Sequence, residues 1–264
     1  MNICLFTKEE IEQPLSLNDE RALHIIKILH KKEGDTFAAG IIGGMAGTAT
    51  ITSVQTQKGT SSDGRKTFTK GFLTYTFTPL TDGKPLNPLI MIIGFPRPIQ
   101  LKRLLRDMAG LGACEIHLTA TELGEKSYLK SDLATTDAGY KMLLEGTEQA
   151  AGTHVPLLKI HTSLNDCLTQ LQLARPSLRK IALDNINPAA SLCSALAKDP
   201  PVTDGRPQTV AAAIGSERGW TNSERALLEQ HGFARLGMGN RVLRTETAAT
   251  VAASLILGAM GALE

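Results

Sequence analysis

Two glycine-bounded stretches hold the residues of this chain that are best suited to binding a ligand. They cover 211–221 and 236–247, and their turns carry Gly215, Gly219 and Gly239. In each, an apolar, strand-like run stops at glycine, passes through a polar turn and enters a segment with helix-start residues. Loops at the carboxyl ends of parallel strands expose backbone N–H and C=O groups, and glycine lets a ligand approach them closely. The pattern therefore predicts a ligand site at the rim of a parallel sheet.

Common nucleotide and hydrolase motifs fit this chain poorly. The segment 237–242 has two of the three glycines of the G-x-G-x-x-G dinucleotide fingerprint, and it comes late in the chain. There is no G-x-x-x-x-G-K-[ST] phosphate loop, no G-x-S-x-G elbow and no H-E-x-x-H helix. Nucleotide hydrolysis, esterase and zinc-peptidase chemistry thus lack their usual residues, whereas an adenosine- or dinucleotide-binding enzyme stays an alternative.

Strand and helix signals alternate over the second part of the chain, and this order must position the two loops. Strands are predicted at 89–94, 115–120, 156–160, 180–183, 210–214 and 233–238, and helices at 101–111, 136–151 and 164–173 and after residues 222 and 245. Such alternation is typical of an α/β domain with a mostly parallel sheet and helices on both faces.

The first part of the chain has a different pattern. One helix is predicted at 18–30, where Asn18 is a possible cap and Ala22, Ile25, Ile26 and Leu29 form an inward stripe. Strands are predicted at 35–42, 46–55 and 70–78, which together suggest a small barrel. The polar segment 57–66 is predicted to be a hairpin loop, and 79–88 to be a linker. The predicted domains are therefore 1–80 and 86–264.

Composition excludes several classes of protein. With 42% hydrophobic and 20% charged residues, the sequence has the composition of a folded globular protein. The four cysteines are far apart, with no C-x-x-C pair and no histidine at ligand spacing, so neither a zinc site nor a disulfide framework is expected. No signal peptide is evident, and the uncharged segment 247–263 is predicted to be a buried helix of small residues. We therefore expect a cytoplasmic protein without a metal and without a membrane span.

Basic residues gather in two segments although the net charge is only +2. The first group is Arg21, His24, Lys27, His30, Lys31 and Lys32, and the second is Arg97, Lys102, Arg103 and Arg106. Each group alone is compatible with the solvated face of a helix. Together they make RNA a candidate partner.

Two motifs resemble a known family. The segment 214–224, Ile-Gly-Ser-Glu-Arg-Gly-Trp-Thr-Asn-Ser-Glu, is similar to I-G-P-E-G-G-F-S-x-x-E. The segment 238–248, Met-Gly-Asn-Arg-Val-Leu-Arg-Thr-Glu-Thr-Ala, is similar to L-G-x-R-I-L-R-T-E-T-A. Both are signatures of the RsmE-type 16S ribosomal RNA uridine-N3 methyltransferases of the SPOUT class. Segments 21–35 and 145–156 also resemble stretches of that family.

This resemblance implies a fold, a cofactor and an assembly. The family has an amino-terminal PUA-like β-barrel for RNA and a SPOUT domain whose carboxyl-terminal helix threads a trefoil knot. It binds S-adenosylmethionine in the knot and works as a homodimer with each pocket near the subunit interface. The implied function is methylation of small-subunit ribosomal RNA at uridine N3. An RNA-binding protein that kept the fold without turnover is the alternative from another class.

Roles for individual residues follow from the resemblance and from side-chain chemistry. The expected cofactor-binding residues are Leu183, Ile214, Gly215, Glu217, Gly219, Leu236, Met238, Gly239, Val242 and Leu243. The expected catalytic residues are Arg241 and Arg244, which would hold an RNA phosphate or a developing uridine anion, and Glu246, which would orient one of them. The expected RNA-binding residues are Arg21, His24, Lys27, His30, Lys31 and Arg103.

Simpler interpretations of the same residues stay open. Glu246 is also explained as an acid in the first turn of a helix, and Arg241 as a partner in a structural ion pair. Glu217 is better explained as fixing its loop than as a base, and Trp220 as a core residue.

The departures from the family pattern lie mostly where cofactor or RNA would make contact. Ser216 replaces proline, Arg218 replaces glycine, and Gly152-Thr153 occupies the place of a serine and the approach to an arginine. Arg218 would add a cation beside a pocket for a cationic cofactor.

Overall fold

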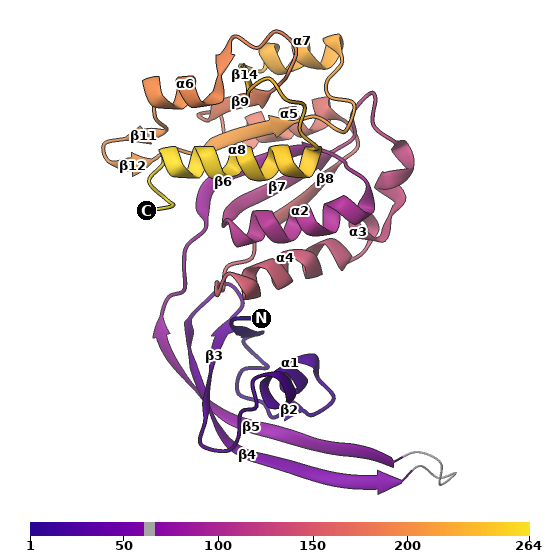
Figure 1. Cartoon of the computed structure of the whole chain (residues 1–264), viewed down its shortest axis with the longest axis vertical. Coiled ribbons are helices and arrows are strands. Elements are labelled where there is room, and N and C mark those ends of the chain that lie inside the picture. The colour runs from indigo at the N-terminus through magenta and orange to yellow at the C-terminus, as the bar shows by residue number, and fades with distance from the viewer. Residues whose placement is uncertain (61–66) are drawn as a thin grey trace. The chain divides into compact units, whose positions relative to one another are not determined.

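The computed structural model describes residues 1–60 and 67–264, with the side chains of 57–60 and 67–70 outside the description. The chain divides into two compact units (Figure 1). The first consists of Met1–Lys84 together with Glu148–His154, and the second of Pro85–Thr147 together with Val155–Glu264. The segment Glu148–His154 lies inside the predicted second domain but packs with the first unit.

The first unit is built on one five-stranded sheet. Its strands are β1 (Cys4–Phe6), β2 (Leu15–Ser16), β3 (Thr36–Ile41), β4 (Ala46–Thr60) and β5 (Thr67–Thr81), in the order β1-β3-β4-β5-β2. The three predicted strands of this region are confirmed. β4 continues to Thr60, so the predicted loop at 57–66 was wrong over its first four residues, and 61–66 lie outside the described residues. Closure of these strands into a PUA-like barrel stays a prediction.

The helix of the first unit is shorter and less regular than its sequence pattern predicts. α1 (Glu20–Leu23) is capped by the Asp19 side chain and not by Asn18, and the π-helical turn η1 (His24–Ile28) follows. Ala22 and Ile25 are fully buried, whereas Leu29 is 42% exposed. A π-helical turn hydrogen-bonds five residues apart, so it shifts later side chains off the 3.6-residue stripe. The predicted inward stripe therefore ends before Leu29.

The second unit contains a seven-stranded sheet in which every pair of neighbours is parallel, as the sequence predicted. Its order is β10-β14-β9-β13-β6-β7-β8. The strands are β6 (Asn87–Gly94), β7 (Ala113–Thr119), β8 (Leu157–His161), β9 (Arg179–Leu183), β10 (Ala190–Ser191), β13 (Val210–Ile214) and β14 (Ala234–Gly237). β11 (Val202–Thr203) and β12 (Arg206–Pro207) form a separate hairpin.

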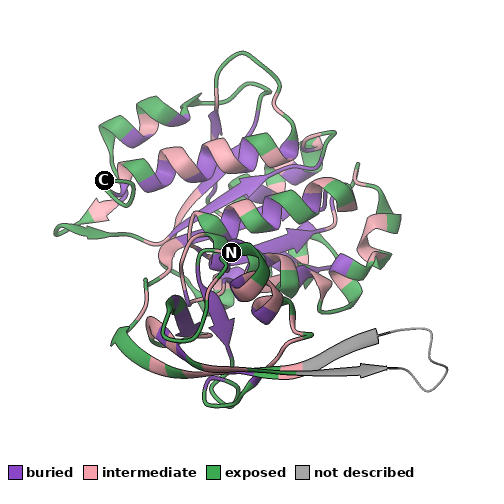
Figure 2. Cartoon of the chain, turned by 60° about the horizontal axis from the view of Figure 1, so that its bottom comes forward, coloured by how far each residue is buried: buried purple, intermediate pink, exposed green. Residues whose placement is uncertain are grey.

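Helices cover both faces of this sheet, because residues of each central strand alternate between two cores. In β6, Leu89, Met91 and Ile93 belong to one core, and Ile90 and Ile92 belong to the other. Buried strands run through the unit in Figure 2. The first core includes α2 (Pro98–Gly110), α4 (Ala138–Gln149), α6 (Leu192–Lys198) and α8 (Thr245–Ala259). The second includes α5 (Leu164–Ala174) and α7 (Asn222–Gln230).

The carboxyl-terminal helix α8 packs through small side chains. Ala249, Ala252 and Ala253 are fully buried, and α8 lies against α2 on the same face of the sheet (Figure 1). Small residues let two helix backbones approach closely, so the absence of charge in this segment reflects burial within the unit. Among the described residues, no helix combines the length and apolar character that crossing a membrane requires. The connection before α4 also contains η2 (Lys126–Lys130) and α3 (Asp132–Thr135), which the sequence analysis did not predict.

Candidate active site

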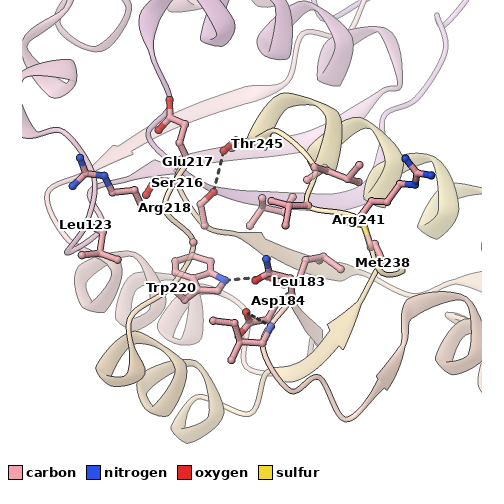
Figure 3. Close-up of a pocket in the computed structure, with 18 of the residues that line it drawn as sticks. Leu123, Leu183, Asp184, Ser216, Glu217, Arg218, Trp220, Met238, Arg241 and Thr245 are labelled. Atoms are coloured by element: carbon pink, nitrogen blue, oxygen red, sulfur yellow. Dashed lines mark hydrogen bonds between the residues drawn. The ribbon is translucent and has the colours of Figure 1, made fainter.

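A pocket of about 410 Å³ opens at the carboxyl ends of β9, β13 and β14, three neighbouring strands (Figure 3). We call it the rim pocket. Its walls come from the two glycine-bounded loops, the start of α8 and the segment that follows β9. The lining residues are Leu123, Leu183, Asp184, Asn185, Ile186, Ile214, Gly215, Ser216, Glu217, Arg218, Gly219, Trp220, Arg225, Met238, Gly239, Arg241, Val242, Leu243, Thr245 and Ala248.

The first loop is a tight turn that depends on two glycines. The Gly219 N–H donates to the Ser216 carbonyl at 2.8 Å, and Gly219 has a φ of +71°. A Cβ on Gly215 would lie 2.9 Å from the Gly219 Cα, so only glycine fits there. The Ser216 hydroxyl accepts a hydrogen bond from the Thr121 hydroxyl at 2.9 Å, which anchors the turn to the loop after β7. Backbone atoms therefore form this wall of the rim pocket.

The second loop also depends on backbone conformations that favour glycine. Gly239 has a φ of +95°, where a side chain would be strained. A Cβ on Gly237 would lie 2.9 Å from Pro188 Cγ. At the first residue of α8, the Thr245 hydroxyl lies 3.5 Å from the Gly215 carbonyl oxygen, so the two loops meet at that residue. The sequence prediction that both loops face one site is consistent with this geometry.

Trp220 joins the rim pocket to the core beneath it. Its indole is 2% exposed, and Nε1 donates to the Leu183 carbonyl at 3.1 Å. Its interpretation as a core residue is confirmed, although one edge lines the pocket. Directly after it, Thr221 and Glu224 form a capping box that starts α7. Hydrogen bonds thus fix the chain at Trp220, where the first loop ends, and at Thr221, where α7 starts.

Asp184 is a polar residue of the rim pocket that the sequence analysis missed. Its carboxylate accepts from Arg225 Nε at 2.6 Å, from Arg235 at 3.2 Å and from the Ile186 N–H at 3.1 Å. Burial raises the pKa of Asp184, but these hydrogen bonds and charges outweigh burial and hold the pKa below its ordinary value. An acid directly after the predicted strand 180–183 was the available signal, because carboxyl ends of parallel strands carry ligand sites.

Nine of the ten residues predicted to bind a cofactor line the rim pocket. Leu236 does not, because its side chain points into the core from β14, where the residue is 6% exposed. Glu217 accepts from the Arg97 N–H at 2.9 Å, so its carboxylate ties the first loop to the start of α2. The interpretation of Glu217 as a residue that fixes its loop agrees with this bond.

The three residues predicted to be catalytic have different positions. Arg241 is exposed and lines the rim pocket, and no described carboxylate lies within ion-pair distance of it. Arg244 is the N-cap residue of α8, makes no capping bond through its side chain and does not line the pocket. Glu246 lies in the first turn of α8, as its simpler interpretation expects, and pairs with neither arginine in the described part of the chain. Only Arg241 is brought to the pocket wall.

The residues predicted to contact RNA have different surroundings. Arg21 is bound by Asp19 at 2.8 Å and Glu10 at 3.2 Å and lies over the Phe6 ring, so its charge is largely neutralised. The buried His24 Nε2 has no hydrogen-bond partner among the described residues. The other residues predicted to contact RNA are accessible to a ligand. Lys27 and His30 are exposed and Lys31 is half-buried in the first unit, and Arg103 is exposed on α2 in the second.

Two departures from the family motifs have structural explanations. Thr153 is fully buried in the first unit, where its hydroxyl donates to the Gly44 carbonyl at 2.7 Å. Ser216 supplies the acceptor for Thr121. Arg218 is exposed and lines the rim pocket on the side opposite Arg241 (Figure 3). Of these three changes, Arg218 alters the charge of the pocket wall.

Comparison with known proteins gives matches over almost the whole chain. The profile of the RNA methyltransferase domain family matches residues 83–257. Ribosomal RNA small subunit methyltransferase E of Treponema pallidum is 41% identical over 263 residues, covering 97% of this chain and 91% of that relative. Ribosomal RNA small subunit methyltransferase E 1 of Borreliella burgdorferi is 32% identical over 256 residues and covers 97% of both chains.

The fold is also similar to that of solved structures. A ribosomal RNA small subunit methyltransferase E from Neisseria gonorrhoeae, bound to S-adenosyl methionine, superposes with a TM-score of 0.69 at 21% identity. The match covers 98% of this chain and 97% of that chain. At this identity the likeness shows a shared fold alone, an α/β arrangement with a parallel sheet.

Proposed function

Because the chain belongs to the RNA methyltransferase domain family, in its ribosomal RNA small subunit methyltransferase E type, we propose that it methylates uridine N3 in 16S ribosomal RNA. S-adenosylmethionine is the proposed methyl donor. The observation that carries the proposal is the rim pocket, where both motif-bearing loops converge in a cavity of about 410 Å³. This volume lies within the range of roughly 300–1,000 Å³ that is usual for small-molecule sites.

The shape of the rim pocket supports a cofactor held by backbone groups. Left-handed turns at Gly219 and Gly239 leave space at two points where any side chain would project. Adenine and methionine portions of the cofactor would be held there, between apolar walls formed by Leu183, Met238 and Leu243. Bound in this pocket, S-adenosylmethionine supplies an electrophilic methyl group together with its own leaving group. The protein must then hold methyl and acceptor in line.

Arg241 is the proposed group that acts on the acceptor. A guanidinium stays charged and donates in a fork, so it suits an RNA phosphate or the anion that develops as uridine N3 loses its proton. Its exposure and its freedom from a carboxylate among the described residues leave this charge available. Arg244 and Glu246 stay in the proposal as catalytic residues, although neither lines the rim pocket of this chain.

The proposal extends to RNA binding and assembly. Lys27, His30 and Lys31 on the first unit, and Arg103 on the second, would contact RNA phosphates. A PUA-like barrel in the first unit, a trefoil knot at the carboxyl terminus, a cytoplasmic location and a homodimer with the pocket near its interface follow from the family resemblance. Sedimentation equilibrium of the purified protein tests the dimer, and a monomer at micromolar concentration would contradict it.

Arg218 supports a second candidate, an RNA-binding protein that kept the fold without turnover. It places a cation on the wall of a pocket that would receive a cationic sulfonium. The adenosine- or dinucleotide-binding enzyme is a third candidate that uses the same rim.

Calorimetric titration separates the three candidates. We expect S-adenosylmethionine and S-adenosylhomocysteine to bind with one site per chain and NAD not to bind. Small subunits from cells that lack this uridine methylation should then accept a methyl group, and Arg241→Ala should abolish transfer while keeping cofactor affinity. Binding of NAD alone would favour the dinucleotide reading. Binding of RNA without any of the three small molecules would favour the RNA-binding protein.

A further inference from the structure

Two histidines and a cysteine meet in the interior of the second unit, away from the rim pocket. They are His117 on β7, His161 at the end of β8 and Cys167 on α5, and we call them the histidine cluster. Their exposed fractions are 1%, 2% and 0%. One ligand atom from each lies within 4.8 Å of the other two. The proposed methyl transfer uses none of them.

The distances within the histidine cluster suit a tetrahedral metal ion. His117 Nδ1 lies 3.1 Å from His161 Nε2 and 3.7 Å from Cys167 Sγ. Ligands at zinc distances are separated by about 3.3 Å for two nitrogens and by about 3.6 Å for a nitrogen and a sulfur. Two of the three separations therefore match a zinc ligand set, and the third, between His161 and Cys167, is within 4.8 Å.

The outer nitrogen of each histidine faces a carboxylate. His117 Nε2 lies 3.1 Å from Glu115, whose carboxylate also pairs with Lys159 and Arg175. His161 Nδ1 lies 3.5 Å from Asp166 and has no hydrogen-bond partner among the described residues. Carboxylates that accept the second ring N–H are the usual supports of histidine ligands of zinc, because they fix the ring and its tautomer.

These partners leave an electrostatic conflict that a cation would resolve. A carboxylate accepts, so Glu115 requires the proton of His117 on Nε2 and leaves a lone pair on Nδ1. If His161 carries its proton on Nδ1, facing Asp166, its Nε2 lone pair points at that of His117. If the proton is on Nε2 instead, the lone pair of Nδ1 faces the Asp166 carboxylate. Each neutral tautomer therefore leaves one unfavourable contact, either two facing imidazole lone pairs or the Nδ1 lone pair of His161 beside the Asp166 carboxylate, which is 40% exposed.

We propose that His117, His161 and Cys167 bind a divalent transition metal of the zinc type. Mixed imidazole and thiolate ligands favour Zn²⁺ over Mg²⁺ or Ca²⁺. Three protein ligands leave one tetrahedral position for water. Bound there, the ion would link β7, β8 and α5 at the edge of the sheet and stabilise the native state. This assignment departs from the sequence-based expectation of no metal. Sequence spacing gave no signal, because the ligands come from three elements up to 50 residues apart.

Cobalt(II) titration of the full chain tests the site. We expect one equivalent to give the visible bands of a tetrahedral ion and a near-ultraviolet thiolate-to-cobalt band. Cys167→Ser should lose the thiolate band, and Cys114→Ser should keep it, since Cys114 shares β7 but is outside the cluster. Neither band in the wild type, or a thiolate band that follows Cys114, would overturn the proposal. A proton would then occupy the space between the two rings.

A second variant keeps the test decisive if Cys167→Ser does not fold. Asp166 is 40% exposed, so Asp166→Asn should fold, and loss of the carboxylate behind His161 should weaken zinc affinity roughly ten- to hundredfold. Asp137→Asn is the matched control, because Asp137 is an exposed acid that pairs with Lys141 elsewhere in the unit. Zinc affinity is measured by competition with a chromophoric chelator. Equal affinity in both variants would contradict the assigned geometry.

Discussion

The rim pocket and the histidine cluster belong to one sheet but are built from different parts of the chain. The pocket lies at strand ends, and backbone turns at Gly215, Gly219 and Gly239 set its shape. The cluster lies where β7, β8 and α5 meet, and side chains that are at most 2% exposed form it. A site made of backbone turns can admit a large ligand, whereas a site made of buried side chains has room for little more than an ion.

The difference also predicts how each site responds to mutation. An exposed loop contributes few buried contacts, so changes there should affect ligand affinity more than folding stability. Buried polar groups that lose a partner cost free energy of unfolding directly. Separating effects on affinity from effects on stability therefore tests whether the two sites are as different as their construction suggests.

The largest expected effect on folding stability is at Asp184. Unlike the glycine turns of the rim pocket, this residue is buried and is held by two arginines. Asp184→Asn removes the charge between Arg225 and Arg235 and should lower the free energy of unfolding by roughly 1.5–3 kcal/mol at neutral pH. Urea unfolding measures the difference. If the free energy of unfolding is unchanged, Asp184 contributes no more to stability than an exposed loop residue. The contrast between the two sites would then be weaker.

The same variant has a defined pH dependence. The folded pKa of Asp184 lies below its ordinary value, so the unfolded chain takes up the proton first as pH falls. The stabilisation is thus fully present above the unfolded pKa of about 3.9 and is lost as pH falls through the folded pKa. The gap between wild type and Asp184→Asn should shrink at about pH 3. Asp204→Asn, at a turn where asparagine is equally tolerated, should show no gap at either pH.

Gly239→Val should lose ligand affinity in addition to stability, and a matched glycine variant elsewhere separates the two losses. Valine at a φ of +95° is strained by roughly 1–3 kcal/mol, and relief of that strain would displace the turn into the rim pocket. We expect S-adenosylmethionine affinity to fall roughly ten- to hundredfold by calorimetry, with an unchanged circular-dichroism spectrum.

Gly205→Val is the matched control for that prediction. Gly205 has a φ of +72°, lies in the turn of the β11–β12 hairpin, and has open space where a Cβ would project, as Gly239 has. Both variants should therefore lose similar stability, and only Gly239→Val should lose ligand. Equal affinities would remove the second loop from the cofactor site.

The two sites also explain which features the sequence revealed. The rim pocket was predictable because its backbone turns need glycine at recognisable positions after two apolar runs that have the length of strands. Leu236 was misplaced because strand residues alternate between faces, and the motif alone does not say which face the pocket occupies. The histidine cluster was not predictable, since its members meet only after β7 and β8 have paired.

The helical segment of the first unit also shows what a sequence pattern can and cannot predict. The apolar stripe at 18–30 correctly placed Ala22 and Ile25 in the core. It failed at Leu29 because a π-helical turn changes the period. The count of basic residues in the same segment gave no sign that Glu10 and Asp19 pair with Arg21. Charge counting in a sequence detects the number of cations but not the carboxylates that fold against them.

The basic segment of the first unit, residues 27–32, belongs to neither site and is expected to affect RNA binding alone. Changing Lys27, Lys31 and Lys32 together to Ala should weaken RNA binding and flatten its dependence on salt. Each lost phosphate contact should lower the slope of log affinity against log salt by about 0.7–0.9. Cofactor affinity should not change. Fluorescence anisotropy with a 16S fragment over a range of salt concentrations measures the slope.

The control for this triple variant is a change of equal charge elsewhere. Lys126, Lys130 and Lys141 are exposed lysines of the second unit. Their replacement by Ala should leave the slope nearly unaltered. A slope that falls equally in both variants would mean that RNA senses net charge and not the basic segment, and an unaltered slope in both would make that segment a solvated helix face.

Arg218 should give the smallest effect, and it decides whether the rim pocket keeps its proposed function. Its side chain is exposed on the pocket wall, so water screens its repulsion of a sulfonium. Arg218→Gly, which restores the residue of the family motif, should tighten S-adenosylmethionine binding by up to about fivefold. Arg218→Gln removes the charge without adding backbone freedom, so it should reproduce that gain. If cofactor affinity stays constant and RNA affinity falls in both variants, Arg218 holds a phosphate. If neither affinity changes, the guanidinium points into solvent, and the departure from the motif has no effect on the site.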